Sequence, residues 1–293
     1  MRSVVVPDSV ACVDAATWVQ NLSETSNPAY AWEHIEESDR VAASCVEGTQ
    51  MTEALDAWHE ATQTDAFVLE SVEDALKLTT LIGPVLVEVA TFVLDEEWED
   101  ADEALAASLR SLVSAAHGTR STVTTMAALH GIENVVAFAN LVTVRHGWEH
   151  FPALAAEVSK LEEQPVGWSS IIDRGIRGDY LQSRSIVSED ARRQGMFDRL
   201  RYDPIHTAHL LDTAYVRFVR TRGPGLMVIG DEEDEFDARC GPVETLYNAD
   251  GCAWANPDDL LSRNLSMAEQ LEAQTLVIER WLRRLADSRP RQR

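Results

Sequence analysis

The apolar residues of this chain recur at helical spacing over most of its length, and this pattern restricts what it can fold into. Strand-like alternation of apolar and polar residues is nearly absent. Helix-start signals agree with the pattern, because Ser71 is followed three residues later by Asp74, and Pro257 opens the last apolar run. The sequence therefore predicts an all-α protein, built as an irregular multi-helix bundle or helical array. The expected helices cover residues 51–67, 72–94, 101–116, 121–145, 151–161, 190–200, 206–220 and 257–285.

One short run departs from the helical pattern. Residues 226–229 are apolar and β-like, and they follow a Gly-Pro-Gly sequence. This run predicts either a loop or one minor β element near 226–229. The acidic run that follows, 231–237, lacks the glycine and the final glutamate of a calcium-binding loop, which favours a solvated loop.

Charge divides the chain unevenly. Residues 1–170 carry 28 acidic and 7 basic side chains, whereas residues 171–293 carry 21 and 18. The change coincides with a Pro- and Gly-containing segment at 163–168. We therefore expect an acidic helical part at 1–165 and an arginine-bearing helical part at 166–293, with a single domain as the alternative.

The net charge of −24 bears on partners. Such a field repels nucleic acid and anionic lipid, so the sequence predicts a protein partner and no nucleic acid. The arginine-bearing segment 174–222 has ten arginines against six acids and no nucleic-acid-binding motif. We interpret it as the complement of an acidic surface, with these residues as the candidate partner surface: Arg192, Arg193, Arg199 and Arg201. The oligomeric state is not encoded in any pattern that we recognise.

Membrane association is not indicated by the apolar runs. The most apolar stretch, 81–94, is too short to span about 30 Å of hydrocarbon and contains Pro84 and Glu88. We expect a buried helix there and no membrane span. Residues 1–7 lack the apolar core of a signal peptide, which predicts either a cytosolic protein or one whose targeting segment has been removed.

Two pairs of histidines are the candidate metal ligands. His146 and His150 are four residues apart, and His206 and His209 are three apart with Asp212 one turn further. Together they would supply four nitrogens and a carboxylate, as in a zinc-dependent hydrolase. The more common interpretation of helical histidines is a surface or core-edge position without a metal, so we expect no cofactor and keep zinc as the alternative.

No other catalytic pattern is present. The sequence has no G-x-S-x-G elbow, Gly-rich phosphate loop or S-x-x-K segment. The four cysteines lack C-x-x-C spacing, which argues against a thiolate zinc site. Cys240 and Cys252 flank a turn-rich loop that a disulfide could close, and from spacing alone a disulfide and unpaired thiols are equally open.

Several segments resemble a group of proteobacterial envelope proteins that have an N-terminal membrane anchor and an all-helical periplasmic domain. They are 27–31 (NPAYA), 121–131 around Met126, 171–180 (IIDRGIRGDY), 203–209 (DPIHTAH) and 248–251 (NADG). His206 and His209 depart from the group, which would have asparagine there. The resemblance implies a periplasmic or envelope location and favours the Cys240–Cys252 disulfide, and it carries no catalytic residue over.

These inferences lead to one functional expectation and one alternative. We expect a non-enzymatic helical protein of the bacterial cell envelope, acting as a protein-interaction or structural module. The alternative is a metal-dependent hydrolase that uses the helix-borne histidines. The location follows the resemblance, and a cytoplasmic protein is the alternative.

Overall fold

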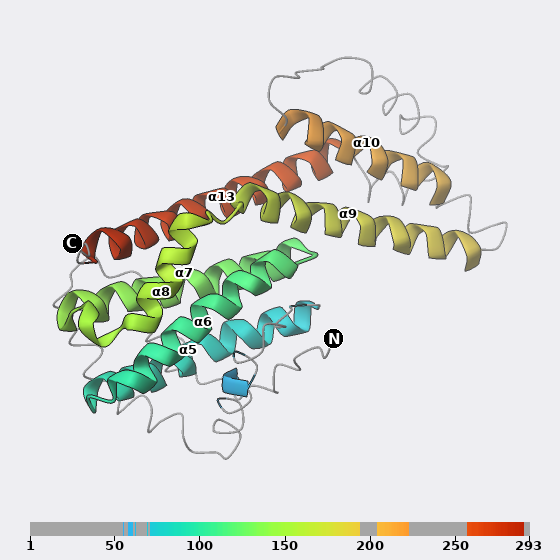
Figure 1. Cartoon of the computed structure of the whole chain (residues 1–293). Coiled ribbons are helices and arrows are strands. Elements are labelled where there is room, and N and C mark those ends of the chain that lie inside the picture. The colour runs from blue at the N-terminus through green and yellow to red at the C-terminus, as the bar shows by residue number, and fades with distance from the viewer. Residues whose placement is uncertain are drawn as a thin grey trace. The chain divides into compact units, whose positions relative to one another are not determined.

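The computed structural model describes residues 71–193, 204–222 and 257–289, together with a few single residues between 55 and 69. This part of the chain is all-helical, which confirms the predicted fold class (Figure 1). Its elements are α5 (Val72–Leu94), α6 (Trp98–Gly118), α7 (Thr122–His146), the 3-10 helix η1 (Trp148–His150), α8 (Pro152–Glu163), α9 (Trp168–Arg193), α10 (Pro204–Arg222) and α13 (Pro257–Ser288). The predicted β element at 226–229 lies outside the described residues.

The backbone groups into two compact units. Unit 1 contains Met1–Thr119, Val123–Ile172 and Leu271–Arg293, and unit 2 contains Arg120–Thr122 and Asp173–Gln270. The last helix therefore contributes its first part to unit 2 and its second part to unit 1. The chain passes from unit 1 to unit 2 after residue 172 and returns to unit 1 at residue 271. The predicted division into an acidic part and an arginine-bearing part at 165 stays a prediction.

Helix α5 starts as its sequence predicts. The Ser71 hydroxyl accepts a hydrogen bond from the backbone N–H of Asp74 at 3.1 Å, and the Asp74 carboxylate accepts one from the backbone N–H of Ser71 at 2.9 Å. This reciprocal capping box satisfies two N–H groups that the first turn would otherwise leave without partners. Pro84 lies inside the helix and is buried, as expected for a core helix rather than a surface one.

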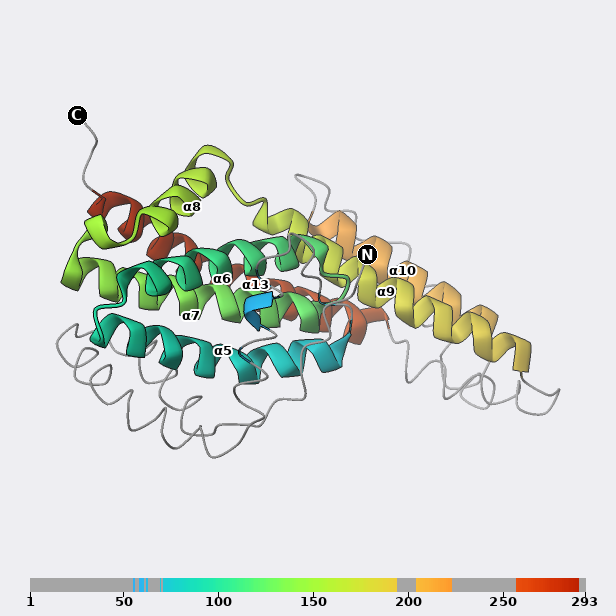
Figure 2. The same ribbon diagram turned by 60° about the horizontal axis from the view of Figure 1, so that its bottom comes forward.

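The core of unit 1 lies where α5, α6 and α7 run side by side (Figure 2). Gly131 on α7 sets one close approach, because a Cβ atom there would lie 2.8 Å from a methyl group of Leu112 on α6. Trp58 is also buried and donates to the Ser108 hydroxyl at 3.2 Å. The buried leucines and isoleucines of this core include Leu78, Ile82, Leu86, Leu105, Leu109, Leu112, Leu129 and Ile132.

Two of these helices are long and apolar enough to cross a membrane by length and composition alone, Val72–Leu94 and Thr122–His146. Their most apolar windows are 61% and 72% buried inside the structure, and the core helices of soluble proteins have the same properties. The expected absence of a membrane span therefore stays a prediction.

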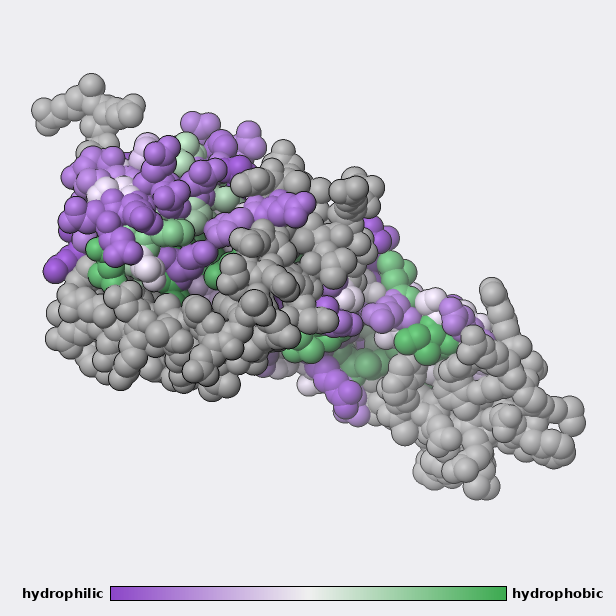
Figure 3. Space-filling view, turned by 90° about the horizontal axis from the view of Figure 1, so that it is seen from below, coloured by the Kyte–Doolittle hydropathy of each residue, from purple (hydrophilic) through white to green (hydrophobic). Residues whose placement is uncertain are grey.

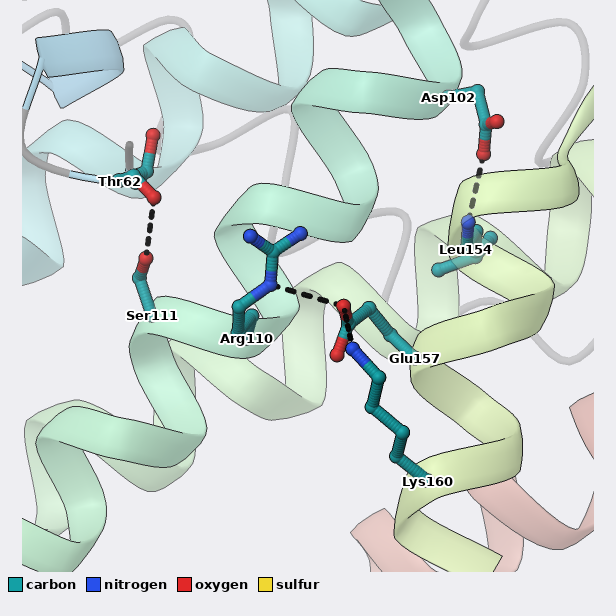
Figure 4. Close-up of polar contacts among 7 residues, drawn as sticks. All are labelled: Thr62, Asp102, Arg110, Ser111, Leu154, Glu157 and Lys160. Atoms are coloured by element: carbon teal, nitrogen blue, oxygen red, sulfur yellow. Dashed lines mark hydrogen bonds and ion pairs between the residues drawn. The ribbon is translucent and has the colours of Figure 1, made fainter. Parts of the chain in front are cut away.

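A single carboxylate from α6 supports the start of α8. The residue before α8, Phe151, has no side-chain acceptor, and Pro152 has no N–H to satisfy. Asp102 supplies the missing acceptors, taking hydrogen bonds from the backbone N–H groups of Ala153 at 2.7 Å and Leu154 at 2.8 Å. Figure 4 shows the bond to Leu154. Two of the N–H groups that α8 leaves unsatisfied are thus capped from another helix.

The next turns of α8 are tied to α6 by an ion-pair cluster. Glu157 on α8 is buried and accepts from Arg110 on α6 at 3.0 Å and from Lys160 at 2.8 Å (Figure 4). Lys160 lies on α8 itself, so the contact from Arg110 is the one that joins α8 to α6, and Lys160 adds a second donor to the same carboxylate oxygen.

We predict that Asp102→Asn destabilises the chain by about 1–3 kcal/mol, because an amide can accept only one of the two hydrogen bonds and turns an N–H toward the other donor. Chemical denaturation measures the effect. Glu103→Gln changes an exposed neighbour on the same helix and should stay within about 0.5 kcal/mol of the wild type. Equal stability of the two variants would remove Asp102 as a support of α8.

Unit 2 has a smaller core between α9, α10 and the first part of α13. Val187 of α9 packs with Ala208, Leu210 and Leu211 of α10, and Leu260 packs against this cluster. The carboxylate of Asp179 on α9 accepts from the backbone N–H of Thr122, the first residue of α7, at 3.1 Å, and also from the Thr122 hydroxyl. A carboxylate from another helix therefore caps this helix start too.

The residue beside that cap is a glycine for a steric reason. A Cβ atom on Gly178 would lie 1.6 Å from the backbone oxygen of Arg120. Real Cβ atoms do not approach oxygen so closely, so the α9 backbone can lie against this carbonyl only without a side chain.

We predict that Gly178→Ala destabilises the chain by about 1–3 kcal/mol, although the same change in an exposed helix interior is stabilising. Gly167→Ala is the matched control, since its nearest neighbour would be the Ser170 Cβ at an ordinary 3.9 Å. Thermal melts of the two variants compare them directly. A neutral or stabilising Gly178→Ala would show that the two backbones separate at little cost.

Candidate functional site

The first histidine pair lies around a tryptophan in unit 1. The Trp98 ring at the start of α6 lies 4.9 Å from the His146 ring and 4.4 Å from the His150 ring, measured between centroids. The phenyl ring of Phe151 meets the same indole edge-on at 6.2 Å. The structure brings His146 and His150 together around Trp98, but not on one helix face as predicted, because α7 ends at His146 and His150 lies in η1 after Gly147.

The environment of His146 disfavours its charged form. Burial is the main cause that lowers its pKa below 6.5, and the positive charges of Arg145 and His150 lower it further. The carboxylate of Glu96 acts in the opposite direction and does not cancel them. The folded cluster therefore favours the neutral form of His146.

The second set of predicted ligands lies on α10 in unit 2. The Asp212 carboxylate accepts from the Tyr180 hydroxyl at 2.7 Å and from the Arg184 guanidinium at 2.9 Å. The Tyr180 and Tyr215 rings stack at 4.2 Å beside this pair. Burial, and then the hydrogen bond to Asp212, raise the pKa of Tyr180. Asp212 thus has partners of its own in unit 2.

Within the described ranges, no group of three or more His, Cys, Asp or Glu side chains is placed to hold a metal ion. His206 and His209 both lie on α10, and His209 is exposed. The zinc site and the hydrolase alternative therefore stay predictions without a described ligand cluster.

The remaining predicted residues lie at the end of α9 or outside the described part of the chain. Arg192 and Arg193 lie in the last turn of α9. Cys240, Cys252, Arg199 and Arg201 are outside the described residues. The disulfide and the arginine partner surface stay predictions.

A feature that the sequence analysis missed is a cleft in unit 1. Figure 3 shows a surface that is largely hydrophilic where residues are described, with smaller apolar patches between. A hollow of about 450 Å³ lies between α8, the segment that links it to α9, and the second part of α13. Its apolar lining consists of Val158, Leu161, Pro165, Val166, Trp168, Leu282 and Ala286, and its charged lining of Glu162, Glu279, Arg283 and Asp287.

A second hollow adjoins the first. It has a volume of about 800 Å³ and shares Glu162, Ala286 and Asp287 with the first. Its other lining residues come from η1, α8 and the end of α13: Trp148, Glu149, Pro152, Ala155, Ala156, Ser159 and Arg289. We call the two hollows together the α8–α13 cleft.

The cleft is held open by polar contacts between its walls. The guanidinium of Arg289 donates to the backbone oxygen of Ala155 at 3.1 Å, to the Ser159 hydroxyl, and to the Glu162 carboxylate at 2.8 Å. The Trp148 indole donates to the Ser288 hydroxyl at 3.1 Å. These contacts fix the end of α13 against α8 and η1, so the cleft belongs to the folded chain and needs no rearrangement to exist.

The lining of the cleft is mixed, with apolar and polar surface in about equal measure. The described side chains that line it include no histidine, cysteine or lysine. No protein-family model, characterised protein or solved structure matches this chain.

We predict that folding stability depends on His146 between pH 5 and 7.5. The pKa of His146 is lower in the folded state than its unfolded value of 6.5. Its contribution to the free energy of unfolding is therefore complete above pH 6.5 and is lost as the pH falls from 6.5 toward the folded pKa. The loss amounts to about 1.4 kcal/mol for each unit by which the pKa is lowered. Urea denaturation of wild type and His146→Gln should give a shallower pH dependence for the variant.

Measurements at pH 8 are the internal control for this comparison, because His146 is neutral there in both the folded and unfolded states. The stability difference between the two proteins at pH 8 reports lost packing alone. An unchanged pH dependence in the variant would show that His146 is not the group that titrates.

Proposed function

We propose that this chain is a non-enzymatic protein-interaction module of the bacterial cell envelope, and that its partner binds in the α8–α13 cleft. The observation that carries the proposal is a hollow lined by apolar and charged side chains, built on helices that contact one another through the hydrogen bonds of Arg289 and Trp148. Apolar surface in such a cleft is exposed to water when no partner is bound, which is unfavourable. A partner that covers this surface removes that cost.

The cleft has a size suited to a protein segment. The lining residues on α13 run from Glu279 to Asp287, which corresponds to about 12 Å along the helix axis. This length accommodates about two turns of a partner helix, as in the recurring helix-in-groove mode of recognition.

The other parts of the proposal rest on the sequence. The envelope location comes from the resemblance of short segments to periplasmic helical domains. The acidic excess of residues 1–170 supports a protein partner over nucleic acid, since polyanions are repelled by such a field.

Site-specific photo-cross-linking in cells of the source organism tests the proposal. A photoreactive amino acid in place of Leu282, which lines the cleft, should give one discrete adduct of higher mass. The matched control is Leu276 on the same helix, which is 62% exposed and does not line the cleft. Because both positions are leucines on α13, the comparison separates a specific surface from general stickiness.

The proposal predicts adducts at Leu282 and at a second cleft position, Leu161, and none at Leu276. Absence of an adduct from both cleft positions, or adducts of equal yield at Leu276, would contradict it. Fractionation of the same cells tests location, since recovery of the protein only with cytoplasmic markers would reject the envelope assignment.

A further inference from the structure

We infer that the segment bound by the α8–α13 cleft is a basic amphipathic helix of a partner protein; this rests on the proposed function and adds the chemistry of the occupant. The inference starts from the charges of the rim. Glu279, Arg283 and Asp287 follow each other at four-residue intervals on α13, so they lie along one side of that helix. The two acids are exposed.

The rim acids differ from Glu162 in their environment. Glu162 is engaged by Arg289 at 2.8 Å, which offsets its charge within the chain. Glu149 adds another exposed carboxylate at the far end of the cleft. With the Arg289–Glu162 pair set aside, the charged lining consists of Glu149, Glu279 and Asp287 against Arg283, which leaves an excess of two negative charges.

The apolar residues that line the cleft, which we call its floor, are best covered by apolar groups of the partner. Trp168 and Val158 are buried, and Leu161, Leu282 and Ala286 are half-buried, so their remaining exposed surface faces the hollow. A partner stripe with apolar residues at i, i+3 or i+4 and i+7 would cover this surface over the length available.

The spacing of the acids adds a constraint on the partner. Glu279 and Asp287 are eight residues apart, or about 12 Å along α13. A partner helix therefore matches best when two basic residues flank its apolar stripe about two turns apart, with an acidic or neutral residue between them opposite Arg283. Complementary charges of this kind set register and orientation more than affinity.

Binding of designed peptides to the purified full chain tests the inference. Four fluorescent peptides of about 16 residues are compared by anisotropy: a basic amphipathic helix with the charge spacing above, the same helix with glutamate for each base, the same with glutamine, and a scrambled basic sequence without an apolar stripe. The basic amphipathic peptide should bind tightest, and its affinity should fall as salt is raised.

Charge reversal locates the interaction. The double variant E279K/D287K should weaken the basic peptide about tenfold and strengthen the acidic one, because two attractions become two repulsions. The double variant E99K/E103K makes the same change of net charge at exposed positions of α6 outside the cleft, and should alter both affinities far less. Gain of binding by the acidic peptide cannot come from a misfolded variant.

The outcomes separate this inference from the proposed function. Three outcomes would overturn the inference of a basic amphipathic helix. They are equal binding of the acidic and basic amphipathic peptides, equal binding of the scrambled and amphipathic basic peptides, and no binding of any peptide. If cross-links form at Leu282 in cells while the basic peptide fails, the interaction module stands and its occupant has another chemistry. If the basic peptide binds with the expected charge swap while cells give no cross-link, the cleft has the inferred preference and the cellular proposal fails.

Discussion

The hydrogen bonds from α8 to Asp102 are the contact on which the site in unit 1 depends. Asp102 is buried, and burial raises the pKa of its carboxyl while the N–H groups of Leu154 and Ala153 act against this. The ionised group is costly at this position unless both donors are present, and the first turn of α8 is unsatisfied unless the acceptor is present. Each side therefore requires the other. Since α8 forms one wall of the cleft, a carboxylate on α6 determines where that wall lies.

The same device occurs in unit 2, where Asp179 receives the N–H and hydroxyl of Thr122. Both helix starts receive an acceptor from a residue at least fifty positions away in the sequence. Capping across such distances joins helix formation to tertiary packing, because the start of the helix is satisfied only once the other helix has docked. This dependence suits a chain whose helices carry many acids and would otherwise repel one another.

The sequence predicted most of the described helices, but it missed α9 over residues 168–189 and did not reveal the cleft. Periodicity predicted the helices that became α5, α6 and α7, and the Ser71–Asp74 capping box located the start of α5, because both signals are local. His146 and His150 also lie close together, but through the turn at Gly147 and the shared contact with Trp98 and not through one helix face. The cleft depends on the pairing of α8 with a helix more than one hundred residues later, and no local pattern encodes that pairing. The one available signal was the alternation of Glu279, Arg283 and Asp287, which is equally typical of any solvated helix.

The rigidity of the cleft bears on how tightly it can bind. Three contacts hold α13 in unit 1 before any partner arrives: Arg289 with α8, Ser288 with Trp148, and Gln274 with Glu133 on α7 at 3.1 Å. In the complex that we propose, a partner helix would meet walls that are already ordered, and the entropy lost on binding would fall mainly on the partner. Affinity would then be governed by how well the partner is preorganised as a helix and by its match to the rim. By the same reasoning, loosening Arg289 would lower affinity without altering a single apolar group on the floor.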